Sequence, residues 1–199
     1  MSPDAADGSP PRRVADVPSV LLERRVVLVS GEVDAARASE LGATLMTLDA
    51  TGDGRVELRL SSCRGPLDAA LALIDVLEVL GVPVHATALG TIEGGPVGVF
   101  AACEVRRLAP HGVLRLREPD VEVAGTASDL ERALAAQGAQ RAGFLAHLAH
   151  RVGRPLSEVE AEWDRGAYLE AGDAVALGYA DALLGAPARR AGPDPSRAP

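Results

Sequence analysis

The chain has 199 residues, 47% of them hydrophobic but only 3% aromatic, so Leu, Val and Ala must fill its core. A chain of this length buries about two-thirds to three-quarters of its unfolded surface as one domain. Its net charge of −8 argues against a nucleic-acid partner, because phosphate binding needs a basic surface.

No apolar stretch reaches the ~20 residues that span a bilayer, and no basic segment followed by an apolar one opens the chain. We therefore expect a cytoplasmic protein with no membrane partner. Cys63 and Cys103 are the two cysteines, too few for a disulfide framework, and reduced thiols fit that compartment.

Residues 1–17 and 186–199 are rich in Pro, Ala and charged residues without periodicity, which predicts flexible tails around one domain at 18–185. Within the domain, strand and helix patterns alternate, which predicts an α/β fold with parallel strands. Strands are expected at 25–30, 55–60, 84–89, 113–116 and 179–183. Helices are expected at 33–48, 67–80, 97–103, 128–152 (capped by Ser128) and 171–177. A capping box at 157–160, beginning with Ser157, is expected to open a further short helix.

The segment GTIEGGP at 90–96 links an apolar strand to an apolar helix. A strand-to-helix turn of this kind can expose one side chain beside free backbone N–H groups, which suits a nucleophile. The exposed position is predicted to be Gly94, which has no side chain. The sequence therefore indicates a hydrolase scaffold without its reactive atom.

Four runs carry a family resemblance: RRVVLVSGEVD, VELRLSSCRG, LDAALALIDVLEVLGVPV and YLEAGDAVALGYADALL. In this order and spacing, residues 19–185 resemble the Clp protease proteolytic subunit family. The resemblance implies a Clp/crotonase-like layered ββα repeat fold. It also implies that the helix at 128–152 is a protruding handle, through which heptameric rings stack. Its apolar residues gather near both ends, so we expect both ends to pack.

The family is a serine peptidase, and the resemblance carries its Ser, His and Asp to Gly94, Arg117 and Gly166. None of these has the required side chain. Glycine offers no nucleophilic atom, and an arginine, with a pKa above ~12, cannot act as a base near neutral pH. The resemblance therefore implies a degenerate triad.

Parts of the scaffold persist. The family's oxyanion-hole donors correspond to Gly65 and Gly95, although Arg64 replaces a glycine of the first loop. Glu93 and Arg117 are both carried to the centre of the former cleft, where an ion pair could occupy the vacant site. The alternative is that each is simply solvated.

The resemblance also bears on partners. Glu57 and Arg59 stand where the family has aromatic residues that receive loops of an ATPase, so direct ATPase docking is not expected. We expect a homo-oligomer, or a hetero-oligomer with active Clp subunits. No cofactor is expected. His147 and His150 are read as solvent or interface histidines, so no metal is expected either.

The sequence thus predicts a catalytically inactive ring subunit with a structural or regulatory role. Two alternatives stay open: an active ATP-dependent Clp serine endopeptidase subunit, and a crotonase-like protein that binds acyl groups. A thiol nucleophile at Cys63 is a weaker option, because no histidine is placed to activate it.

Overall fold

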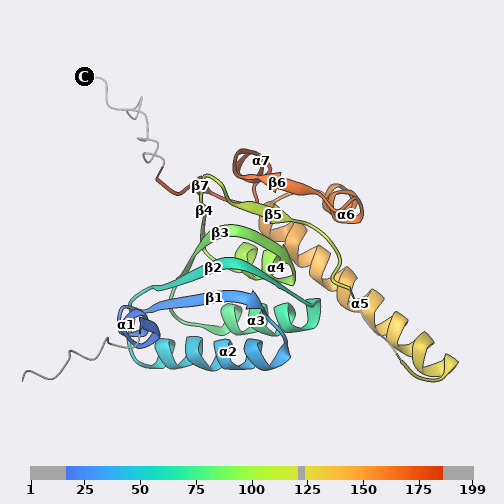
Figure 1. Cartoon of the computed structure of the whole chain (residues 1–199), viewed down its shortest axis with the longest axis horizontal. Coiled ribbons are helices and arrows are strands. Elements are labelled where there is room, and N and C mark those ends of the chain that lie inside the picture. Colours follow the sequence, from blue (N-terminus) through green and yellow to red (C-terminus); the bar gives the residue numbers. More distant parts are fainter. Residues whose placement is uncertain (1–16, 121–123, 186–199) are drawn as a thin grey trace, which may run out of the picture.

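The computed structural model describes residues 17–120 and 124–185. Helices cover one face of a central sheet, and one long helix projects from the body (Figure 1). The predicted α/β class is confirmed. Apart from Val17, which opens the first helix, the predicted tails at 1–17 and 186–199 lie outside the described residues. No helix in the described ranges combines the length and apolarity that a bilayer span needs.

Seven strands and seven helices are present in the described residues. The strands are β1 (Val26–Glu32), β2 (Val56–Gly65), β3 (Val84–Gly94), β4 (Val105–Leu108), β5 (Val113–Arg115), β6 (Tyr168–Glu170) and β7 (Ala182–Leu183). The helices are α1 (Val17–Glu23), α2 (Ala35–Ala50), α3 (Leu67–Val79), α4 (Gly95–Ala102), α5 (Ala127–Val152), α6 (Leu156–Asp164) and α7 (Ala171–Ala176). The sequence pattern misses α1, β4 and β6, which are too short to show a clear period.

The sheet runs in the order β1-β2-β3-β4-β7 with every pair parallel, while β5 pairs with β3 and carries β6 antiparallel to it. Strand β3 is shared: residues 85–88 pair with β4, and residues 91–93 pair with β5. One bent strand therefore serves two parts of the sheet and directs its carboxyl end toward α4.

The bend crosses three strands. Gly31, Ser62 and Gly90 all have left-handed backbone angles, with φ of 73°, 46° and 67°. The strand register shifts beside the first two of these residues. Such bulges let a strand turn and continue. The predictions that β1, β2 and β3 end at residues 30, 60 and 89 are therefore wrong. Most of the expected glycine turn is strand, and only its last two residues, Gly95 and Pro96, belong to α4.

Helix α4 lies at the centre of the core and is buried on every side. At Gly98, an added Cβ would stand 2.3 Å from Cε2 of Phe144 on α5, so only glycine permits this approach of the two helices. The Phe144 ring also packs against Trp163 of α6, with 5.1 Å between ring centroids. The start of α4 is thereby held by a close-packed core.

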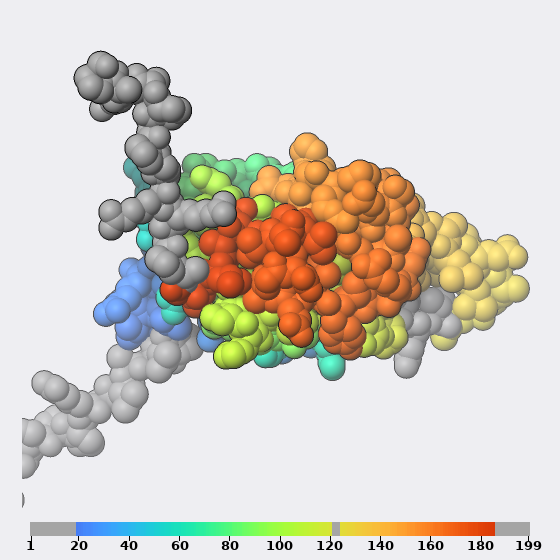
Figure 2. All heavy atoms as spheres, turned by 90° about the horizontal axis from the view of Figure 1, so that it is seen from above, coloured from blue at the N-terminus to red at the C-terminus, as the bar shows by residue number. Residues whose placement is uncertain are grey.

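Helix α5 packs only through its carboxyl-terminal part, where Phe144 and Leu148 are buried. The other half projects into solvent, as Figures 1 and 2 show, and Leu134 is 64% exposed. The prediction that both ends pack is wrong for the isolated chain. Thr126 caps this helix in place of the predicted Ser128, and α6 already begins at Leu156, so Ser157 does not cap it.

Candidate functional site

The turn from β3 into α4 has the backbone shape of an elbow. Gly94 ends β3 with φ 67° and ψ −132°, a conformation that side chains rarely adopt without strain. An added Cβ would lie 3.1 Å from the Gly65 carbonyl oxygen and 3.3 Å from Cγ of Pro119. Gly94 is therefore buried in the single chain, whereas the sequence predicts an exposed position. A side chain here would meet a carbonyl and a proline ring.

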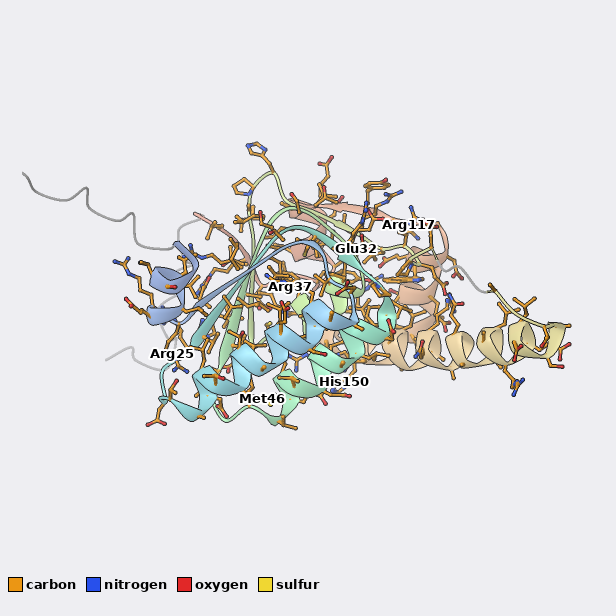
Figure 3. All side chains as sticks on the ribbon, turned by 60° about the horizontal axis from the view of Figure 1, so that its bottom comes forward. Arg25, Glu32, Arg37, Met46, Arg117 and His150 are labelled. Carbon is orange, nitrogen blue, oxygen red and sulfur yellow. The ribbon has the colours of Figure 1, made fainter. Side chains whose placement is uncertain are left out.

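A cavity of about 450 Å³ opens beside this elbow. It lies at the carboxyl ends of β1, β2 and β3 and beside β5, the edge where parallel α/β sheets hold their sites. Figure 3 labels two of its residues, Glu32 and Arg117, which come from β1 and from the segment after β5. The lining residues are Glu32, Arg64, Gly65, Pro66, Glu93, Gly94, Arg115, Arg117, Pro119 and Asp120.

The three positions assigned to the triad are neighbours in space. An added Cβ at Gly94 would lie 3.7 Å from the Arg117 carbonyl oxygen. The Leu116 N–H donates to the Ala167 carbonyl at 2.8 Å, which continues the antiparallel register of β5 and β6. That register sets Arg117 opposite Gly166. Gly166 has φ 64°, and no atom lies within 4 Å of an added Cβ there. Their descent from a triad stays a prediction.

The two predicted oxyanion positions lie at the same place. Gly65 ends β2 and pairs with Gly94 of β3, and Gly95 is the first residue of α4. At each of them an added Cβ would approach a backbone carbonyl to 2.4 Å, that of Val33 or that of Pro66. The backbone is therefore closely packed here, and the donor role of these two N–H groups stays a prediction.

Glu93 lies between two arginines. Its Oε2 is 3.1 Å from Nη1 of Arg115, and its Oε1 is 3.6 Å from Nε of Arg117. Arg117 also donates from Nη2 to Asp120 at 2.7 Å and from Nε to the Glu118 carbonyl at 3.2 Å. The pair proposed from the sequence is thus a contact, but Arg115 is the closer partner. These charged side chains line the wall of the cavity and do not fill it.

Sequence reasoning missed Arg115. Its guanidinium also stacks over the Tyr168 ring, with Cζ 4.7 Å from the ring centroid. The sequence spacing of Arg115 and Arg117 indicates this role, because residues two apart on a strand point to the same face. The expected strand at 113–116 therefore places Arg115 on the same face as Arg117, the residue that the resemblance carries to the cleft.

The other candidate side chains lie elsewhere. Cys63 is buried, and burial raises the pKa of its thiol to about 12, so the thiol stays protonated near neutral pH. Cys63 also does not line the cavity. His147 of α5 is 3.5 Å from Glu78 of α3, and burial lowers its pKa. Within the described ranges, no three His, Cys, Asp or Glu side chains form a group that could hold a metal ion.

Comparison with known proteins gives consistent matches. The Clp protease family model matches residues 9–186. The chain is 29% identical over 168 residues to the ATP-dependent Clp protease proteolytic subunit 2 of Thermobifida fusca (strain YX), covering 82% of each chain. It is 28% identical over 173 residues to the ATP-dependent Clp protease proteolytic subunit 1 of Rhodopirellula baltica (strain DSM 10527 / NCIMB 13988 / SH1), covering 85% of this chain and 76% of that protein.

Proposed function

The chain belongs to the Clp protease family, and from that premise we propose that it is a catalytically inactive ring subunit with a structural or regulatory role. The α/β fold with a projecting α5 is the Clp/crotonase-like fold. The observation that carries the proposal is the composition of the cavity wall. Among the described residues, no Ser, Thr, Cys or His lines the cavity at the elbow.

Acyl transfer needs a nucleophilic oxygen or sulfur and a base that accepts its proton near neutral pH. The wall instead supplies three arginines and three carboxylates. Arginine stays protonated. The best buried of the carboxylates, Glu93, already faces two guanidinium groups. This set can hold charge in place, but it contains no hydroxyl, thiol or imidazole group of the kind that serine and cysteine peptidases use.

Assembly with other subunits is the second part of the proposal. Both relatives are named as proteolytic subunits of an ATP-dependent protease. In the single chain, Leu130 and Leu134 of α5 are exposed on the projecting half of the helix, which is compatible with packing against another subunit. We propose that the partners are copies of this chain or active Clp subunits.

We do not expect an ATPase to dock directly on this subunit. Glu57 of β2 accepts a 2.6 Å hydrogen bond from the Thr87 hydroxyl, and Arg59 is exposed. An apolar anchor placed there would have to remove water from both charged groups, which is costly. An ATPase would then dock through other subunits of the ring.

Two measurements test the proposal. Purified protein is incubated with a fluorogenic peptide and with a fluorophosphonate probe, beside an active Clp proteolytic subunit as positive control. We expect neither turnover nor labelling. The native complex is then isolated from its own cells, weighed intact and its subunits identified. Turnover by the pure chain, or a purely monomeric native mass, would contradict the proposal.

A further inference from the structure

The ion pairs around the cavity are not equally buried. Glu93, Arg115 and Arg117 form the inner wall, with side chains 22%, 28% and 29% exposed. The other charges lie at the rim: Asp120 is 94% exposed, and the Glu32–Arg64 pair is exposed on both sides, with 3.6 Å between its charged groups. Charges in water are screened, so the rim compensates the inner wall only weakly.

At the inner wall two guanidinium charges face one carboxylate. Glu93 is fully engaged, because each of its oxygens faces one arginine. Each arginine nevertheless keeps one terminal nitrogen free of hydrogen bonds to described residues, Nη2 of Arg115 and Nη1 of Arg117. The N-terminus of α4, beside Gly94, adds partial positive charge to the same wall.

We propose that this cavity binds a small organic carboxylate, held by Arg115 and Arg117. Guanidinium groups are suited to carboxylates because their N–H groups match the two oxygens. The local excess of a single positive charge at the inner wall matches a monoanion and is too small to balance a phosphate dianion. The volume of about 450 Å³ lies in the range of small-molecule sites, which is roughly 300–1,000 Å³. This activity goes beyond the proposed ring role.

The first test uses the full chain without any variant. N-acetylalanine, which carries a carboxylate, is titrated by calorimetry and by NMR beside N-acetylalanine amide, a neutral analogue of similar shape, and inorganic phosphate. We expect binding of the carboxylate alone, weakening as salt is added. Equal binding of the amide, stronger binding of phosphate, or no binding of the carboxylate would overturn the proposal.

Variants then locate the site. Arg117→Gln should weaken carboxylate binding at least tenfold, while Glu93→Gln should strengthen it several-fold, because it removes the competing carboxylate. Arg37→Gln, which breaks an exposed 3.0 Å pair on α2, is the matched control and should leave binding unchanged. Circular dichroism confirms that each variant is folded. Weaker binding in Glu93→Gln would contradict the assignment of Glu93 as a competitor. Because the readout is binding, its failure leaves the test for turnover and assembly unaffected.

Discussion

Arg154 donates from one nitrogen to both carboxylate oxygens of Glu162 at 2.8 Å, which joins the turn after α5 to α6. The Tyr179 hydroxyl donates to the same carboxylate at 2.8 Å, and burial raises the pKa of that phenol. Glu162 is buried, so its charge depends on these partners. The network fixes the segment that brings Gly166 opposite Arg117.

Breaking this buried pair should be costly. We expect Glu162→Gln to lower the free energy of unfolding by about 3–5 kcal/mol, because it leaves the Arg154 charge without its buried counterion. Glu158→Gln is the matched control: Glu158 accepts from the same arginine at 2.7 Å, but its side chain is 54% exposed. Its loss should stay below about 1 kcal/mol. Urea unfolding of both variants checks this, and equal losses would contradict it.

Two glycine-to-alanine substitutions in helices should change the free energy of unfolding in opposite directions. Gly98→Ala places a Cβ against the Phe144 ring, and overpacking of this kind costs about 1–3 kcal/mol. Gly143→Ala on α5 meets no atom within 4 Å and should stabilise the protein by up to about 1 kcal/mol. Thermal and urea unfolding give both values. A neutral Gly98→Ala would show that α4 and α5 pack less closely than described.

The sequence predicts the long periodic elements well. Helices α2, α3 and α5 lie within a few residues of their expected bounds, because an apolar stripe over many residues indicates the 3.6-residue period. The ends of β1, β2 and β3 are not predicted. They depend on pairing between distant strands across bulges, and Gly31, Ser62 and Gly90 resemble turn residues when only the local sequence is considered.

The cleft is predicted in part. The structure brings Gly94, Arg117 and Gly166 together, and their assignment to a triad stays a prediction. Pro119 covering the elbow could not be predicted, because its position depends on the path of the chain after β5. The ordering of Glu93 between two arginines likewise depends on the register of β3 with β5.

Restoring the nucleophile alone should not restore hydrolysis. Gly94→Ser supplies an oxygen but no base or orienting acid, so turnover of a fluorogenic peptide should stay at background. The variant should also lose about 1–3 kcal/mol of stability, because its φ of 67° suits glycine and the Gly65 carbonyl is close. Gly138→Ser, which lies in open space on α5, is the control for a new serine. Appreciable turnover by Gly94→Ser would overturn the roles assigned to Arg117 and Gly166.

Acid should remove the contribution that the ionised Asp181 side chain makes to the stability of the fold. Burial opposes ionisation of this carboxyl, but hydrogen bonds from the Arg106 side chain and backbone outweigh it and lower the pKa of Asp181. Because the pKa of Asp181 is lower in the folded chain, its carboxylate stabilises the fold at pH values above the pKa of an unfolded Asp, about 3.9. This contribution is lost as the pH falls through the pKa of the folded state.

The matching measurement is urea unfolding of Asp181→Asn and the parent chain between pH 2 and pH 8. We expect the parent to be the more stable of the two by a constant margin above about pH 5, and this margin to shrink in acid as the carboxylate becomes protonated. A margin that grows on acidification would have the wrong sign for a lowered pKa.

The bend at Gly31, Ser62 and Gly90 has a consequence for the history of such a chain. The bend belongs to the backbone of three paired strands. The path of the chain into α4 therefore does not depend on which side chain stands at position 94. Reaction chemistry and scaffold are therefore separable traits. A side chain can be lost at residue 94 without any change in the path of the three strands that lead into α4.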